Sequence, residues 1–251
     1  MTQVSLVLAS NSPRRRELLS LGGWTFHIDP ADVDESRLPG EAPAVYVLRL
    51  AEEKARACAE CSQSGQIMIG ADTAVVDGDE ILGKPTDPAD AARMLAQLRG
   101  RVHQVYTGLA LFRPPSESND SSRWELSQRR EPNNPLGRLP DGHPSDNLIT
   151  DLCVTDVPMR NYTDAEIEAY VATGDPLDKA GAYAIQHPGF HPVERMAGCY
   201  ASVMGLPLCH LTRSLRKLSF QPQTDISAAC QAHLSYDCPV TQAILRGDTA
   251  G

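Results

Sequence analysis

The sequence predicts an α/β fold built around a mixed β-sheet, because apolar strand-like runs alternate with helical patterns along most of the chain. Two local signals support this prediction. The apolar run at residues 4–9 leads into Ser12 and Pro13, which are typical of a helix N-cap and a first helical residue. The dipeptide Asp77-Gly78 lies within an apolar stretch and predicts a tight hairpin, because glycine supplies the positive φ of such a turn. No internal repeat is apparent.

The other elements follow in order along the chain. Thr163 and Glu166 form a capping box, which predicts a helix that Gly174 ends. The remaining expected elements are a helix at 43–60, a strand at 67–71, the hairpin at 75–82, a helix at 87–99, strands at 102–112, 148–158 and 183–185, and a last helix within 199–218.

Two segments lack this order. Residues 113–147 are rich in Pro, Ser, Asn, Arg and Asp, and a structureless loop of this length is uncommon inside a compact core. We interpret this segment as a mobile, disordered insertion. Residues 219–251 are poor in apolar periodicity and predict a loosely attached tail. The expected organisation is therefore one domain at 1–218, interrupted by the insertion and followed by the tail.

The composition excludes several classes of protein. The 251 residues carry 23 Lys and Arg against 32 Asp and Glu, and the net charge of −9 argues against a broad basic surface for nucleic acid. No apolar run approaches the roughly 18 residues of a membrane span, and the first ten residues lack a signal-peptide pattern. Seven scattered cysteines do not form a disulfide framework. We therefore expect a cytoplasmic protein without a membrane or a stable nucleic-acid partner.

Positive charge is concentrated where the first helix is predicted to begin. Its first turn holds three consecutive arginines, Arg14, Arg15 and Arg16. The helix dipole makes each positive charge there unfavourable by about 0.3–1 kcal/mol. Free backbone N–H groups, the hydroxyls of Ser10 and Ser12 and these guanidinium groups would form an anion site, for which phosphate is the natural ligand. The alternative is a solvated basic turn that Glu17 partly compensates.

Lys54 lacks a local partner in the helix predicted at 43–60. Its neighbours three and four residues away are Leu50, Ala51, Ala57 and Cys58, none of which is a carboxylate. The nearby pairs Arg49–Glu53 and Glu52–Arg56 do have the i,i+4 spacing of helical ion pairs. Lys54 therefore either contacts a ligand or extends its ammonium group to solvent.

Four further places are candidates for chemistry. Asp72 interrupts an apolar run, and a buried carboxylate needs hydrogen bonds, a cation or a metal unless it forms an Asx-type turn. Lys84 directly follows the hairpin, although its tripeptide is a weak signal. Asp34 and Glu35 suit a hard divalent cation, or are simply solvated. Gln186 ends a short predicted strand, where its amide either contacts a base edge or holds a loop.

The common phosphate-loop, dinucleotide, zinc-protease and serine-hydrolase motifs are absent from the sequence. In order along the chain, its segments nevertheless resemble those of the Maf family of nucleoside triphosphate pyrophosphatases. The resemblance covers about residues 4–218 apart from the insertion. The matching segments are LASNSPRRRELL from Leu8, RLAEEKARA from Arg49, IGADTAVV from Ile69, ILGKP from Ile81, DKAGAYAIQ from Asp178 and SVMGLP from Ser202.

The resemblance implies a mixed, twisted sheet with flanking helices in two lobes around a cleft, as in Maf and ITPase-like folds, and often a homodimer. It also implies hydrolysis of the α–β phosphoanhydride of a nucleoside triphosphate with a divalent cation, Mg or Mn. Asp72 matches the proton acceptor. The implied substrate-binding residues are Ser10, Ser12, Arg14, Arg15, Lys54, Thr73, Lys84 and Gln186, and the implied metal ligands are Asp34, Glu35 and Asp72.

Three positions match those that separate the family's subgroups. The combination of Arg14, Thr73 and Gln186 resembles the dTTP/UTP branch more than the 7-methyl-GTP branch. Ala184 stands where the family has glycine, and the segment from His187 also departs from its pattern. The resemblance therefore implies a pyrophosphatase for dTTP and UTP, or for modified nucleotides. The alternative is a non-catalytic regulator, related to cell division, that binds nucleotides or nucleic acid.

Overall fold

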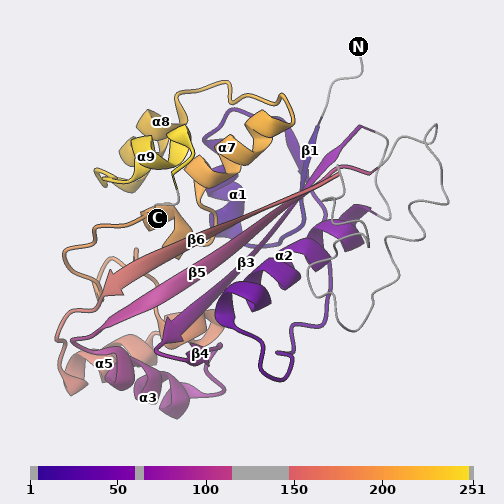
Figure 1. Cartoon of the computed structure of the whole chain (residues 1–251). Helices are drawn as coiled ribbons and strands as arrows, with labels where there is room; N and C mark the ends of the chain where they lie inside the picture. The colour runs from indigo at the N-terminus through magenta and orange to yellow at the C-terminus, as the bar shows by residue number, and fades with distance from the viewer. Residues whose placement is uncertain (1–4, 60–64, 115–146, 249–251) are drawn as a thin grey trace.

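Six strands form one twisted sheet in the computed structural model, which describes residues 5–59, 65–114 and 147–248 (Figure 1). The spatial order is β2-β1-β3-β5-β6, with β4 beside β3. β1 runs parallel to β2 and β3, whereas β3 pairs antiparallel with β4 and β5, and β5 with β6. The mixed sheet is thus confirmed. The strands are β1 (Leu6–Leu8), β2 (Phe26–Ile28), β3 (Ile67–Asp77), β4 (Glu80–Leu82), β5 (Val102–Phe112) and β6 (Leu148–Pro158).

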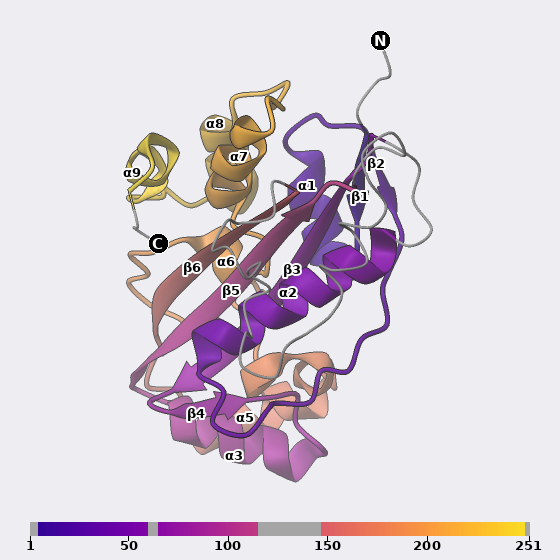
Figure 2. The same cartoon turned by 45° about the vertical axis from the view of Figure 1, so that its right-hand side comes forward.

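Helices flank the sheet on both sides (Figure 2). They are α1 (Pro13–Ser20), α2 (Pro43–Ala59), α3 (Pro88–Leu98), α5 (Asp164–Ala172), α6 (Tyr200–Val203), α7 (Leu208–Lys217), α8 (Ile226–Leu234) and α9 (Thr241–Arg246), with 3₁₀ turns η1 (Asp175–Asp178) and η2 (Ala180–Ala182). Within the described ranges, none of them has both the length and the apolar character that a bilayer crossing requires.

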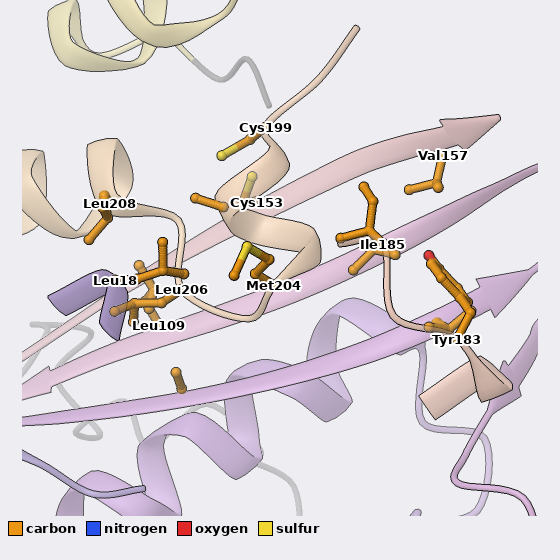
Figure 3. Close-up of a cluster of buried hydrophobic side chains, with 14 of the residues drawn as sticks. Leu18, Leu109, Cys153, Val157, Tyr183, Ile185, Cys199, Met204, Leu206 and Leu208 are labelled. Carbon is orange, nitrogen blue, oxygen red and sulfur yellow. The ribbon is translucent and has the colours of Figure 1, made fainter. Parts of the chain in front are cut away.

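The two faces of the sheet are covered differently. α2 approaches one face closely because Gly70 of β3 and Gly108 of β5 lie beneath it, and a Cβ on either glycine would overlap the α2 backbone. The opposite face carries the largest apolar cluster, which includes Leu18 of α1, Leu109 of β5 and Leu208 of α7 (Figure 3). Residues of β3 therefore alternate between an α2 side and a main-core side.

β3 changes its neighbour along one edge. β1 pairs with residues 67–69, and β4 pairs with residues 75–77. Among the described strands, none pairs with residues 70–74 on this edge, whereas β5 pairs with β3 from Met68 to Val76 on the other. The segment that follows β1 reaches this unpaired stretch, since a terminal nitrogen of Arg15 lies 3.3 Å from Thr73 Oγ1. The stretch lies between the two expected lobes, one containing β1, β2 and α1 and the other β4, α3 and α5 (Figure 1).

Most of the expected elements are present, including the N-cap at Ser12 and the capping box at Thr163 and Glu166. β3 is longer than expected and runs through Asp72, because β5 pairs with its backbone from Met68 to Val76. Likewise, the last helix expected within 199–218 is two helices, α6 and α7, separated by Gly205 with φ of 102°.

The strand expected at residues 183–185 is wrong. Tyr183 itself is extended, with φ of −145° and ψ of 153°, but it directly follows the turn η2, and no described strand pairs with residues 183–185 to form a ladder. The following side chains enter the core from an irregular segment (Figure 3). The phenolic oxygen of Tyr183 lies 2.8 Å from His103 Nε2, in a buried hydrogen bond.

The tail differs from the loose attachment that the sequence predicts. α8 and α9 place Ile226, Cys230 and Ile244 in buried positions, and the first two belong to the main core cluster. Backbone groups also attach the tail near α1, since Trp24 Nε1 donates to Gln221 O at 3.0 Å. Short helices with few apolar residues gave a weak periodic signal because each contributes only one or two side chains to the core.

The expected insertion lies between β5 and β6, and its residues 115–146 fall outside the described residues. At its base, Arg113 N donates to Asn147 O at 2.9 Å, directly beyond the last strand pair, Phe112 with Leu148. The chain thus leaves and re-enters the sheet at adjacent points, so the pairing of β5 with β6 continues to the base of this segment.

Candidate active site

Lys54 joins two carboxylates beside the unpaired stretch of β3. Its Nζ lies 2.6 Å from Glu35 Oε1 and 2.7 Å from Asp72 Oδ1. Lys54 comes from α2, Asp72 from the α2 side of β3, and Glu35 from the loop before α2. Lys54 and Asp72 are only 7% and 8% exposed, whereas the Glu35 side chain is 56% exposed. The lysine that lacks a partner in its own helix therefore pairs with two distant segments.

The two carboxylates differ in their acidity. Burial raises the pKa of Asp72, and the charges of Lys54 and Arg15 oppose this shift without cancelling it. Burial acts in the same direction on Glu35, but the hydrogen bond and charge of Lys54, with the charge of Lys84, bring the pKa of Glu35 below its usual value. Asp72 is therefore the more basic group, which suits it to accept a proton.

Arg15 connects three parts of the site. Its Nε donates to Gly205 O at 2.9 Å, while its two terminal nitrogens lie 3.2 Å from Ser10 Oγ and 3.3 Å from Thr73 Oγ1. Thr73 Oγ1 also lies 3.0 Å from Thr107 Oγ1. These bonds use three of the five N–H groups of Arg15, so its guanidinium positions Ser10 and Thr73 and keeps two N–H groups for a ligand.

Two other cations are available for a ligand. Arg14 is half-buried, and its Nε atom, which is fully buried, has no hydrogen-bond partner among the described residues. Burial lowers the pKa of Arg15, and the positive charge of Arg14 lowers it further. Lys84 is exposed in the segment after β4, close enough to Glu35 to lower the pKa of that carboxyl. Ser12 caps α1 through its hydroxyl, which accepts from Arg15 N at 3.4 Å. Arg14 and Lys84 thus add positive charge from opposite lobes.

Residues that sequence reasoning missed hold the loop that carries Glu35. Tyr46 donates its hydroxyl proton to Glu35 O at 2.9 Å. Arg49 donates to Ser36 O at 3.0 Å and forms a buried ion pair with Glu41, at 2.6 and 2.8 Å. The expected Arg49–Glu53 pair is also present at 3.3 Å. That local pairing gave no sign of the stronger contact with Glu41, which depends on the path of the loop.

Two predicted site residues are not drawn into this cluster. Asp34 is exposed, and its pKa is lowered by a hydrogen bond from the Ser36 side chain and by a second one from Ser36 N, at 2.9 Å from Oδ1. Gln186 is also exposed, and it has no hydrogen-bond partner within the described ranges. The Asp34 carboxylate therefore serves a turn, while the Gln186 amide is free.

The donor set fits a divalent cation in part. Glu35 and Asp72 converge on one ammonium group, and carboxylate oxygens are the ligands that Mg²⁺ and Mn²⁺ prefer. Within the described ranges, no group of three or more His, Cys, Asp or Glu side chains is arranged to hold a metal. Two protein carboxylates are nevertheless compatible with Mg²⁺, which keeps waters and binds substrate phosphates to complete its coordination. Asp34 does not belong to this set in the structure.

The fold and the site together define the class of protein. It is a mixed α/β protein, and carboxylates and cations from both lobes lie close together at the edge of one strand. The family model described as Maf-like protein matches residues 5–218. The chain belongs to the Maf family. Curated relatives agree with this, since a dTTP/UTP pyrophosphatase of Geobacter sulfurreducens is 43% identical over 87% of this chain and 98% of its own length.

A second curated relative, a dTTP/UTP pyrophosphatase of Anaeromyxobacter dehalogenans, is 45% identical over 86% of this chain and 94% of its own length. Among solved structures, the HAM1 protein of Coxiella burnetii is 16% identical, with a TM-score of 0.37 over 64% of this chain and 75% of that one. A nucleoside-triphosphatase (dITP/XTP pyrophosphatase) of Mycobacterium abscessus is 15% identical, with a TM-score of 0.32 over 63% and 75%.

Proposed function

We propose that this protein hydrolyses the α–β phosphoanhydride of dTTP and UTP to the nucleoside monophosphate and diphosphate. The observation that carries the proposal is the buried Asp72 carboxylate, paired with Lys54 beside Glu35. The names of the curated relatives support the reaction and the substrates. Maf-family membership over residues 5–218 supports the same class of enzyme.

The chain's own residues supply positioning, charge neutralisation and a base. Arg14 and Lys84 would contact the phosphate oxygens, where their charges oppose the repulsion between the substrate and the carboxylates. Asp72 would orient a water molecule and accept its proton while the water oxygen bonds to phosphorus. The bond between the α-phosphorus and the bridging oxygen then breaks, and diphosphate leaves with the electron pair of that bond. Lys54 keeps Asp72 in place and limits the cost of burying its charge.

Glu35 and Asp72 are the residues that would hold a divalent cation, Mg²⁺ or Mn²⁺. Such a cation, when bound, polarises phosphate oxygens and stabilises the charge that develops on the leaving group. The exposed position of Glu35 and its lowered pKa favour this role, because the carboxylate stays ionised at neutral pH. Asp34 is expected to act only through the turn that precedes Ser36.

Base preference is the finer part of the proposal. Thr73 is fixed by Arg15 and Thr107, so its hydroxyl has a defined position near the unpaired stretch of β3. Gln186 has a free amide that can form hydrogen bonds with a pyrimidine edge. Together with the relatives' names, these residues support dTTP and UTP over purine nucleotides.

A nucleotide panel tests the proposal. Purified protein is incubated with each canonical NTP and dNTP in Mg²⁺ or Mn²⁺, and both products are measured. We expect dTTP and UTP to give equimolar monophosphate and diphosphate at the highest kcat/KM. Release of orthophosphate alone would contradict the bond assignment. Tight nucleotide binding without turnover would instead favour the non-catalytic regulator.

A further inference from the structure

A second cluster of positive charge lies on the opposite face of the sheet from Asp72. An open pocket of about 340 Å³ is lined by residues of β6, α7 and α9 and the turn that ends α9. Its charged lining residues are Asp151, Arg213, Arg216, Lys217 and Arg246. This volume falls in the range of about 300–1,000 Å³ that is typical of small-molecule sites.

The single acidic side chain of the lining does not offset these cations. Asp151 accepts hydrogen bonds from Arg213 at 2.5 and 2.7 Å and from Ser214 Oγ at 3.0 Å, so its negative charge is already neutralised by the ion pair with Arg213. Burial would raise the pKa of Asp151, but the hydrogen bond and charge of Arg213 bring it below its usual value. The Asp151 carboxylate thus stays ionised, and it orients Arg213 at the pocket wall.

The other cations are far less paired. Arg216 and Lys217 are exposed and make no ion pair with a described residue, and Arg246 has only a distant contact, 3.6 Å, with exposed Asp248. They lie in the last turns of α7 and α9, where each helix end carries a charge of roughly −0.5. Two such ends equal about one negative charge. Helix dipoles therefore account for part of this positive charge and leave an excess.

The pocket is separate from the candidate active site. Asp151 pairs with Leu109, which belongs to the main-core side of the sheet, whereas Asp72 lies on the α2 side and two strands away. The pocket also joins two parts of the chain. Arg213, Arg216 and Lys217 lie within the residues that match the family, while Leu245, Arg246 and Gly247 lie beyond residue 218.

From this geometry we infer that the pocket between β6, α7 and α9 binds the di- or triphosphate group of a small anion. Several adjacent cations suit a ligand that carries several negative charges in a small volume. Guanidinium groups donate paired hydrogen bonds to phosphate oxygens. Because the protein as a whole carries a net charge of −9, binding at this pocket depends on its local excess of positive charge.

Inorganic triphosphate is the probe that tests this inference. Calorimetric titration of the full chain without divalent metal should show two binding sites, one at each cation cluster. The variant R216E/R246E should lose one site, with affinity there reduced about tenfold or more, because charge-assisted hydrogen bonds are lost and repulsion replaces them. The variant R93E/R195E is the matched control, since both of its arginines are exposed and lie outside the pocket.

Competition identifies the source of the phosphate group. UTP should displace triphosphate from the pocket, whereas UMP should not, because recognition requires consecutive phosphates. Thermal unfolding of each variant and its KM for UTP report on folding and on the active site, and both should remain at the wild-type value. R216Q/K217Q repeats the test without charge reversal and should also lose the second site.

Two results would overturn the inference: triphosphate binding that is unchanged in R216E/R246E, or binding at the pocket by duplex DNA or RNA but not by triphosphate. These outcomes are independent of the proposed reaction. The pocket can fail while UTP hydrolysis persists, and hydrolysis can fail while the pocket binds.

Discussion

Lys54 is the residue at which charges from three segments of the chain meet. Removing it would leave buried Asp72 without its closest cation, at a cost that mixes folding with catalysis. Clearer tests of the site use residues whose side chains are less engaged in holding the fold. Arg14 and Tyr46 are such residues, because Arg14 has an unpaired buried nitrogen and the Tyr46 hydroxyl bonds only to the loop that carries Glu35.

We predict that Arg14→Ala raises the KM for UTP by about tenfold or more, since a charge-assisted hydrogen bond to phosphate is lost. Steady-state kinetics measures this. Arg16→Ala is the matched control, because Arg16 lies on the same helix and is exposed. Equal KM values for the two variants would show that Arg14 does not contact the substrate.

Tyr46→Phe removes the hydrogen bond that holds the Glu35 backbone. We expect the Mg²⁺ concentration for half-maximal activity to rise about two- to tenfold, as one hydrogen bond allows. Tyr106→Phe is the control, since that hydroxyl donates to Gln104 Oε1 instead. If metal dependence changed equally in both variants, Tyr46 would have no special role in placing Glu35.

Sequence reasoning identified the right side chains for the central cluster but not their partners. Lys54 and Asp72 were candidates because each breaks a local pattern, and the structure joins them at 2.7 Å. The sequence could not show that Asp34 and Glu35 have different roles. The path of the loop turns Glu35 toward Lys54 and Asp34 toward Ser36. Sequence could not show that Arg15 also holds Ser10, Thr73 and the Gly205 carbonyl, because the farthest of these acceptors lies 190 positions away.

At the scale of elements, local signals were reliable where one turn or cap decides the conformation. The capping box at Thr163 and the hairpin at Gly78 both formed as expected. The length of β3 and the irregular segment at 183–185 were not predictable in this way. They depend on pairing between distant segments, because β5 extends β3 and no described strand pairs with residues 183–185.

Buried His103 on β5 makes the free energy of unfolding depend on pH. Burial lowers the pKa of His103 to about 4, so the unfolded chain, with a pKa near 6.5, binds more protons between these values. The free energy of unfolding therefore rises with pH from about 4 to 6.5, by roughly 3 kcal/mol at most from this group.

His103→Gln should flatten that rise, as denaturant titrations at several pH values would show. His27→Gln is the control, because His27 is exposed on β2. An unchanged slope in His103→Gln would contradict the role of burial.

At the scale of the whole molecule, the tail is part of the core. Ile226 is 3% exposed and belongs to the same apolar cluster as α1 and α7. Ile226→Ala should lower the free energy of unfolding by about 2–4 kcal/mol, through lost burial and the cavity that remains. The same substitution at Ile28, which is 39% exposed, should cost clearly less. Equal costs would mean that α8 is only loosely attached.

The net charge of −9 is compatible with a polyanionic substrate because cations are concentrated locally. Arg15 and Lys84 come from opposite lobes and are far apart in sequence, yet the charges of both lower the pKa of Glu35. Charge totals therefore excluded a broad basic surface and could not indicate where positive charge gathers.

The most direct measurement compares UTP hydrolysis by the wild-type protein, Asp72→Asn and Asp77→Asn, with both products counted. Asp77 is the control because it lies on the same strand and is equally buried, at 9% exposed, but bonds to Gln97 and Arg101. We predict UMP and diphosphate from the wild type and from Asp77→Asn, and a kcat reduced about 10²–10⁴-fold in Asp72→Asn, as expected for loss of a general base. Wild-type turnover in Asp72→Asn, or UDP and orthophosphate as the products, would contradict the account.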